Sequence, residues 1–142
     1  MTEHPNIPFN MKKIISIILI GILIFSCSKE ENNADQIVGN WKLIEAKIYG
    51  FEGLNTIDYS DDTIYYNFQT NGTLIVTGGE NVGYPIGAYD YFFGEDYLGG
   101  MNDPKIILVK INDTKWTYNL ANEKMTLGLS YVDGPDLVFE RK

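Results

Sequence analysis

The stretch TIYYNFQTNGTLIVT, residues 63–77, decides the fold that we expect of this chain. In its first half the large side chains of Ile64, Tyr66 and Phe68 stand at every second position. This period of two is typical of a β-strand that buries one face. An Asn-Gly pair follows at 71–72, and this dipeptide favours the tight turn that joins two antiparallel strands. The stretch therefore predicts a β-hairpin whose first strand buries those three side chains.

Similar patterns continue to the end of the chain and predict a β domain. Further strands are expected over residues 37–47, 105–111, 114–120, 124–129 and 136–141. In the third of these, Trp116, Tyr118 and Leu120 are expected to face inward. Only residues 33–39 have the pattern of a short helix, ahead of the first strand. We expect one all-β domain over residues 37–142, a small antiparallel up-and-down barrel of about eight strands, with a sandwich as the alternative.

Two positions at the ends of this domain resemble a known family of barrels. The motif Gly39-x-Trp41 opens the first strand, and Arg141 follows Phe139 in the last strand. A Gly-x-Trp motif at the start of an all-β domain, with a basic residue near its end, is similar to lipocalin-like (calycin) barrels. The resemblance covers the mature chain and implies that Arg141 lies over the Trp41 indole and closes the base of the barrel. An ordinary core tryptophan is the alternative for Trp41.

An apolar run near the N-terminus predicts a targeting segment. Residues 14–25 are almost all apolar, and two lysines precede them at 12–13. Such a run extends about 18 Å as a helix, whereas the hydrocarbon core of a bilayer is about 30 Å thick. A basic start, a short apolar run and a small residue before the cut are typical of a secretory signal peptide. We expect residues 1–26 to be this signal peptide, with translation starting at Met11.

The only cysteine follows the apolar run directly and predicts a lipid anchor. Residues 24–27, Ile-Phe-Ser-Cys, resemble the bacterial lipobox, which implies that Cys27 carries diacylglycerol and further acyl chains such as palmitate. Several acyl chains anchor a protein more firmly than one. Residues 28–31, Ser-Lys-Glu-Glu, resemble the signal that exports lipoproteins of some Gram-negative bacteria to the cell surface. We expect residues 27–36 to be a flexible tether and the protein to be displayed on the outer membrane, with the inner leaflet as the alternative.

Charge and residue inventory exclude several classes of function. The chain has a net charge of −8, and without residues 1–26 it has −9, from nine basic and eighteen acidic residues. Such a surface repels nucleic acid. The only histidine, His4, precedes Cys27, so the mature chain has no histidine for a Ser–His or Cys–His dyad or for a metal. We therefore expect no cofactor, no metal site and no nucleic-acid partner. We also expect no enzyme, with a glycosidase-like pair of carboxylates as the alternative.

Two hypotheses for binding remain. The first is a small apolar or amphipathic ligand inside the barrel, because about eight strands enclose either one small molecule or a filled core. Its lining would comprise Tyr66, Phe68, Trp116, Tyr118 and Leu127. The second is a glycan- or protein-interaction surface in Gly83–Gly100, where six of eighteen residues are aromatic, among them Tyr89 and Tyr91. A strand with a long loop over the barrel end is the alternative for this stretch.

Overall fold

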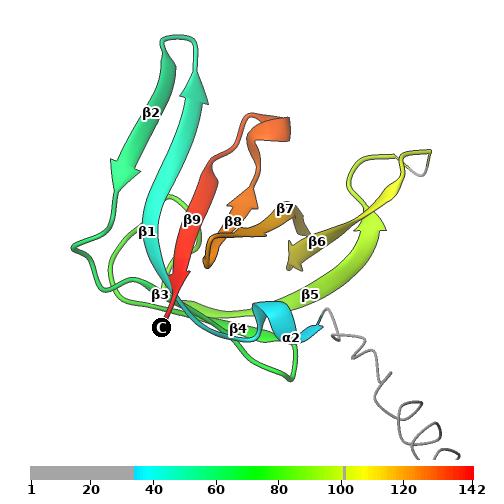
Figure 1. Ribbon diagram of the computed structural model, residues 1–142, viewed down its shortest axis with the longest axis horizontal. Coiled ribbons are helices and arrows are strands. Elements are labelled where there is room, and N and C mark those ends of the chain that lie inside the picture. Colours follow the sequence, from blue (N-terminus) through cyan, green and yellow to red (C-terminus); the bar gives the residue numbers. More distant parts are fainter. Residues whose placement is uncertain (1–33, 101) are drawn as a thin grey trace, which may run out of the picture. The chain divides into compact units, whose positions relative to one another are not determined.

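The computed structural model describes residues 34–100 and 102–142, which belong to one folded unit of the chain (Figure 1). Its elements are α2 (Ala34–Ile37), β1 (Gly39–Gly50), β2 (Gly53–Asp58), β3 (Tyr65–Phe68), β4 (Thr73–Thr77), β5 (Gly87–Tyr97), β6 (Lys105–Ile111), β7 (Thr114–Ala121), β8 (Lys124–Gly128), the 3-10 helix η1 (Ser130–Val132) and β9 (Asp136–Arg141). The predictions for the signal peptide, for translation from Met11, for Cys27 and for the export signal fall on residues 1–33, outside the described part.

The described strands form one antiparallel sheet that closes on itself. Their order is β2-β1-β3-β4-β5-β6-β7-β8-β9, and β1 also pairs with β9 along Trp41–Lys47. The strands β1 and β3 to β9 therefore make a closed eight-stranded barrel, and β2 is an extra strand on β1 (Figure 1). This confirms the predicted all-β barrel of about eight strands. An antiparallel barrel of this kind is consistent with a lipocalin-like fold.

The hairpin predicted from residues 63–77 is present as β3 and β4. The two strands pair in an antiparallel register that places Tyr66 opposite Val76. In the turn between them Gly72 has a φ of 82°, a conformation that glycine adopts without strain. Tyr66 and Phe68 are at most 1% exposed, so the predicted inner face is the buried one.

β1 carries neighbours on both edges and contains a β-bulge. One edge pairs with β9, and the other pairs first with β3 and then, further along, with β2. The register with β9 shifts between Leu43 and Glu45. The extra residue of a bulge moves the alternation of side chains by one position. As a result Trp41, Leu43 and Ala46 are all buried in the barrel.

β2 is a strand that the alternation of the sequence does not predict. Of its residues only Ile57 is partly buried, so the strand lacks a face of large apolar side chains. β1 and β2 continue beyond the pairing with β9 as a two-stranded arm that projects from the barrel (Figure 1). Tyr49, Phe51 and Leu54 are exposed on this arm. Pairing with β1, rather than a buried pattern, therefore makes this segment a strand.

Large side chains fill the interior of the barrel. The fully buried ones include Trp41, Leu43, Ile64, Tyr66, Phe68, Leu74, Ile111, Met125, Leu127 and Phe139. Tyr66 and Phe139 meet edge to face, with ring centroids 4.9 Å apart. Removing this apolar surface from water is the main favourable term in the folding of a small domain.

Candidate functional site

The structure brings Trp41 and Arg141 together at the end of the barrel where the chain enters. The guanidinium carbon of Arg141 lies 4.5 Å from the centre of the Trp41 ring. The indole Nε1 of Trp41 donates a hydrogen bond to the Ile37 carbonyl over 2.7 Å. Arg141 donates to the Gln36 carbonyl over 2.7 Å and to the Val38 carbonyl over 3.2 Å. We call this end of the barrel, where β1 begins and β9 ends, the base.

Gly39 leaves space for the guanidinium at the base. Its φ of 133° lies in a region that residues with a side chain rarely adopt. A Cβ at this position would lie 3.2 Å from Nη1 of Arg141. The glycine therefore turns the chain from α2 into β1 beside the guanidinium, and Trp41, two residues further on, lies beneath it.

The helix α2 forms part of the base. The short helix predicted within residues 33–39 is confirmed, because α2 covers Ala34–Ile37. Residues 34–36 fall within the segment predicted as a tether, yet the Gln36 carbonyl accepts a hydrogen bond from Arg141. The end of that segment is thus joined to the barrel by the last residues of β9.

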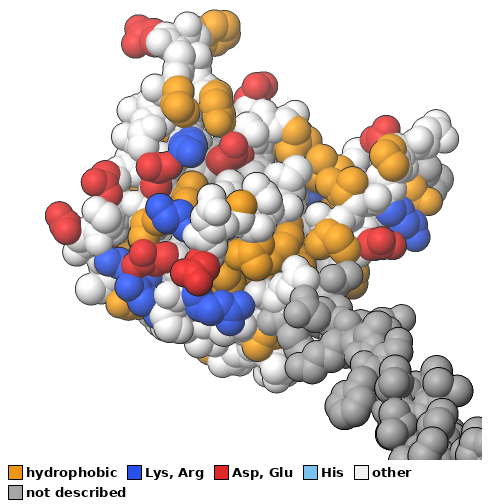
Figure 2. Space-filling view, in the orientation of Figure 1, with side chains coloured by type: hydrophobic (Ala, Val, Ile, Leu, Met, Phe, Trp, Pro, Cys, Tyr) orange, Lys and Arg blue, Asp and Glu red, His pale blue; other side chains and the backbone are white. Residues whose placement is uncertain are grey.

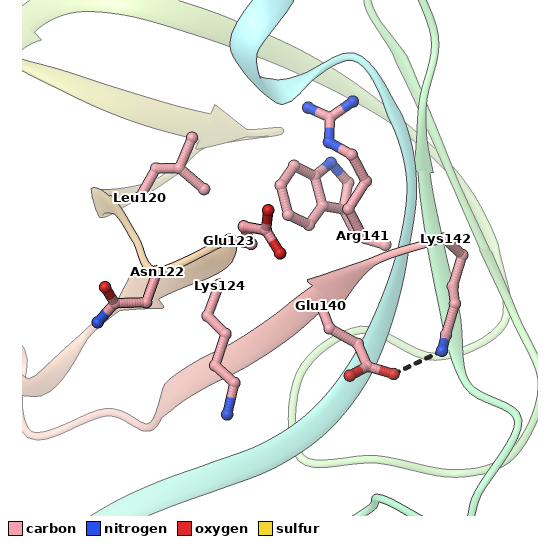
Figure 3. Close-up of a pocket in the computed structure, with 8 residues that line it drawn as sticks. Leu120, Asn122, Glu123, Lys124, Glu140, Arg141 and Lys142 are labelled. Atoms are coloured by element: carbon pink, nitrogen blue, oxygen red, sulfur yellow. Dashed lines mark ion pairs between the residues drawn. The ribbon is translucent and has the colours of Figure 1, made fainter.

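A cleft of about 640 Å³ opens beside the Trp41–Arg141 pair. Its lining comes from β1, the end of β7, the turn to β8 with the first residue of β8, and the end of β9 with the C-terminal residue: Trp41, Leu120, Asn122, Glu123, Lys124, Glu140, Arg141 and Lys142 (Figure 3). Leu120 was expected to face inward, but it lies beyond the packed core and is 40% exposed. It gives the cleft an apolar wall that is open to solvent.

Charged side chains of both signs surround this apolar wall. Figure 2 shows them together over the C-terminal end of β9, next to an area of apolar side chains. Lys142 Nζ lies 2.6 Å from a carboxylate oxygen of Glu140. This contact lowers the pKa of Glu140 and raises the pKa of Lys142. Figure 3 shows the Glu140 carboxylate between the side chains of Lys124 and Lys142. With Arg141 and Glu123, the cleft carries three positive and two negative charges.

Four of the seven side chains predicted to line a ligand belong to the packed core. They are Tyr66, Phe68, Trp116 and Leu127, and each is at most 3% exposed. All four pack in one cluster with other buried side chains. Protein interiors are packed about as densely as organic crystals. A ligand among these residues would therefore have to displace them, and in this structure they fill the barrel.

The other three predicted residues, Tyr89, Tyr91 and Tyr118, are partly buried and pack against the core. The Tyr89 hydroxyl donates to the Pro85 carbonyl and the Tyr91 hydroxyl to the Gln69 carbonyl, each over 2.7 Å. The Tyr118 hydroxyl is buried and has no hydrogen-bond partner among the described residues. Burial raises the pKa of Tyr118. Two of the three hydroxyls therefore already make hydrogen bonds within the domain.

The opposite end of the barrel is closed by the β4–β5 connection, residues 78–86. The Tyr66 hydroxyl donates to Oδ1 of Asn81 over 2.8 Å, and Nδ2 of Asn81 donates to the Tyr84 carbonyl over 3.0 Å. The Tyr84 amide donates to the Tyr66 hydroxyl over 2.9 Å, and Nε1 of Trp116 donates to the Tyr84 hydroxyl over 3.1 Å. Burial raises the pKa of Tyr66. We call this closed network the plug.

Of the charged residues of the cleft, only Arg141 was identified from the sequence. Glu123 lies in a turn, Lys124 begins β8 and Lys142 follows β9, so no local pattern distinguishes them from other surface charges. These residues could be found only from the order in which the strands pair. Once β9 pairs with β1, the β7–β8 turn and the C-terminal residues lie at the same end of the barrel as Trp41.

Comparisons of the chain with protein-family models, with curated proteins and with solved structures find no match. In residues 34–100 and 102–142, no helix combines the length and the apolar character that crossing a bilayer requires. The same residues contain no group of three or more His, Cys, Asp or Glu side chains placed to hold a metal ion. The barrel topology and the geometry of the base are therefore the observations from which a function is inferred.

Proposed function

We propose that this protein is a lipid-anchored binding protein whose base cleft takes a small amphipathic molecule with an anionic head group. The residues that line the cleft are the main support for this proposal. Leu120, which is 40% exposed, gives the cleft an apolar wall beside the buried Trp41, and Lys124, Arg141 and Lys142 stand around it. Small-molecule sites commonly combine a mainly apolar lining with a few polar groups that orient the ligand.

The charge of the cleft favours an anionic head group. The chain has a net charge of −8, whereas the side chains that line the cleft carry three positive and two negative charges. Glu140 is engaged by Lys142, and the Lys124 side chain makes no hydrogen bond or ion pair within the described residues. An anion beside Lys124 would gain a charge-assisted hydrogen bond without breaking an existing one.

The size and position of the cleft support the same ligand class. Its volume of about 640 Å³ falls within the range of small-molecule sites, which is roughly 300–1,000 Å³. The chain leads into the domain through α2, which contacts Arg141 at the base. The cleft is therefore at the end of the domain that the proposed tether joins. A molecule that partitions to a membrane surface suits this position.

Sequence features support the membrane anchor. The short apolar run, the lipobox-like residues 24–27 and the segment 28–31 favour attachment through Cys27 and display on the outer membrane surface. A lone cysteine in an oxidising compartment has no partner in its own chain for a disulfide. Lipid modification gives this thiol a role that an incidental cysteine lacks.

The ligand proposal is tested by calorimetric titration of the mature chain carrying Cys27→Ala, which lacks the lipid. Laurate is the probe, and dodecyltrimethylammonium is a cationic control whose alkyl chain is one carbon longer. Laurate should bind more tightly, and Lys124→Glu should weaken its binding by about tenfold or more. Lys105→Glu changes charge equally at a residue that does not line the cleft, and it should leave binding unchanged. Equal affinity for the two amphiphiles, or none for laurate, would refute the proposal.

The anchor is tested separately in cells. Cys27→Ala should abolish incorporation of labelled palmitate and release the protein from the outer membrane. The net charge of −9 repels anionic lipid surfaces, so the polar tether supplies little affinity of its own. A Cys27→Ala protein that still incorporates palmitate, or still sediments wholly with outer membranes, would falsify the lipoprotein assignment.

A further inference from the structure

The outer face of β5 carries an exposed aromatic ring. Alternation along β5 turns Tyr91 and Phe93 towards the core, where both pack against buried residues. Phe92, between them, points the other way and is 49% exposed. Tyr89 and Tyr91, the residues predicted for a surface site, are on the inner face and bond backbone carbonyls through their hydroxyls. Phe92 is therefore the aromatic residue that this strand offers to solvent.

Gly94 allows the Phe92 ring to lean along the strand. It is two positions further along β5, on the same outer face as Phe92. A Cβ on Gly94 would lie 2.8 Å from Cζ of Phe92 and 3.4 Å from Cε1. These distances place the far end of the ring above Gly94, in the space that a side chain would occupy. The ring is thus held close to the sheet surface with its outer side open to solvent.

Polar side chains lie around this ring in a shallow groove of about 210 Å³. The groove is lined by Asp90, Tyr91, Phe92, Lys110 and Asn112. Lys110 is the cross-strand partner of Phe92 on β6. The backbone N–H of Asn112 donates to the backbone carbonyl of Asp90 over 2.8 Å, which ties the turn after β6 to β5. Among the described residues, the side chains of Asp90, Lys110 and Asn112 make no hydrogen bond or ion pair, so their polar groups are available.

We infer that this groove is a second binding site, distinct from the base cleft, and that it takes a pyranose unit of a neutral saccharide. The apolar C–H face of a pyranose packs on an aromatic ring, whose face carries partial negative charge. The carboxylate of Asp90 accepts hydrogen bonds from sugar hydroxyls, Lys110 donates them, and the Asn112 amide does both. These groups flank the ring on which the sugar would stack.

The charges of the groove favour a neutral sugar over an ionic one. Asp90 and Lys110 carry opposite charges that cancel locally, so the groove offers no net charge to an ionic ligand. The chain as a whole has a net charge of −8, which repels an acidic polysaccharide. A neutral saccharide satisfies the available polar groups without a charge mismatch.

The inference is tested with the full mature protein by titration with three probes: cellohexaose, mannohexaose and polygalacturonate. At least one neutral hexasaccharide should bind, and polygalacturonate should not. Phe92→Ala should weaken that binding by about tenfold or more. Gly94→Ala should have a similar effect, because its methyl group would occupy the place of the ring. Phe51→Ala is the matched control, since this fully exposed phenylalanine lies on the β1–β2 arm and its loss should not alter saccharide binding.

The outcomes separate the saccharide site from other roles of the ring. Thermal unfolding is measured on each variant, and Phe92→Ala alone decides the case if Gly94→Ala does not fold. Absence of binding to both neutral hexasaccharides at millimolar concentration, or equal binding by Phe92→Ala, overturns the inference. Binding of polygalacturonate alone overturns it too. Lys124→Glu, which alters the base cleft, should leave saccharide binding unchanged, so this site stands or falls independently of the proposed amphiphile site.

Discussion

The two ends of the barrel are closed by different interactions. At the plug, Tyr66, Asn81 and Tyr84 bond one another in largely buried surroundings, with the Tyr66 side chain fully buried. At the base, Arg141 covers Trp41 from the solvent side and donates to backbone carbonyls. A cleft with free charged groups remains open beside that pair.

This difference bears on where the proposed ligand site lies. Opening the plug would leave buried polar groups without partners, and each such group costs about 1–3 kcal/mol. Binding at the base breaks no buried hydrogen bond, because the neighbouring charges are already solvated. The contrast predicts that the plug serves stability, whereas the rim of the base is free to serve recognition.

The largest effect on stability is expected from truncating Trp41, the residue of the base that packs in the core. Trp41 is 1% exposed and donates a hydrogen bond to Ile37, so Trp41→Ala removes a large packed side chain together with that bond. Such truncations cost about 3–5 kcal/mol. Chemical denaturation monitored by circular dichroism measures the loss. A change below about 1 kcal/mol, the size of ordinary surface effects, would place Trp41 outside the core.

The next largest effect tests the plug. Asn81→Ala removes the acceptor of the Tyr66 O–H and the side-chain donor to the Tyr84 carbonyl, which should cost about 1–3 kcal/mol of unfolding free energy. Asn119→Ala is the matched control, because Asn119 is exposed on β7. Its effect should stay within about 0.5 kcal/mol. Equal effects of the two substitutions would mean that the plug does not stabilise the barrel.

The alkaline pH dependence of stability should test the contribution of Tyr66 to the plug. Burial raises the pKa of Tyr66 above the ordinary value of 10.0, so its contribution is complete below that pH and is lost as the pH rises towards the raised pKa. The loss is at most about 1.4 kcal/mol per pH unit for this tyrosine. Tyr66→Phe should reduce the slope of unfolding free energy against pH in alkali. At the base, the lowered pKa of Glu140 acts in acid, below its ordinary value of 4.5, and the raised pKa of Lys142 acts in alkali, above its ordinary value of 10.5; Tyr66→Phe leaves both unchanged. An unchanged alkaline slope in Tyr66→Phe would contradict the assignment.

The smallest effect concerns the cover of the base. Arg141→Ala removes the cation over the Trp41 ring, a contact that contributes about 0.5–2 kcal/mol. It should also shift the emission of Trp41 towards that of a solvated indole. Lys142→Ala removes a neighbouring exposed charge and should change neither stability beyond about 0.5 kcal/mol nor emission. If Arg141→Ala behaves like Lys142→Ala, the guanidinium does not cover the indole in solution.

Several strands and their buried faces were predictable from local pattern. Residues 63–77, 105–111 and 136–141 predict strands that the structure contains as β3, β4, β6 and β9, with small differences at their ends. A strand turns successive side chains to opposite faces whatever it pairs with, so the spacing of large apolar residues marks the inner face directly. Tyr66 and Phe68 are the example, since both were expected inside and both are buried.

The same rule fails where a strand passes beyond the core. Leu120 continues the alternation of Trp116 and Tyr118, but β7 extends past the packed interior and leaves Leu120 in the cleft. Likewise, the composition of Gly83–Gly100 shows that aromatic residues are abundant there. It does not show that Phe92 is the one turned outward, because that depends on the register of β5 with its neighbours.

The sequence by itself was sufficient to predict the all-β class and the β3–β4 hairpin. It also singled out Gly39, Trp41 and Arg141 as residues that matter at the ends of the domain. These features rest on interactions between near neighbours or on a motif. Closure of β1 on β9, the bulge beside Leu43, the β1–β2 arm and the base cleft required the folded molecule. Each of them arises from pairing between segments distant in sequence, and the free energy of such pairing depends on all the strands that close the barrel together.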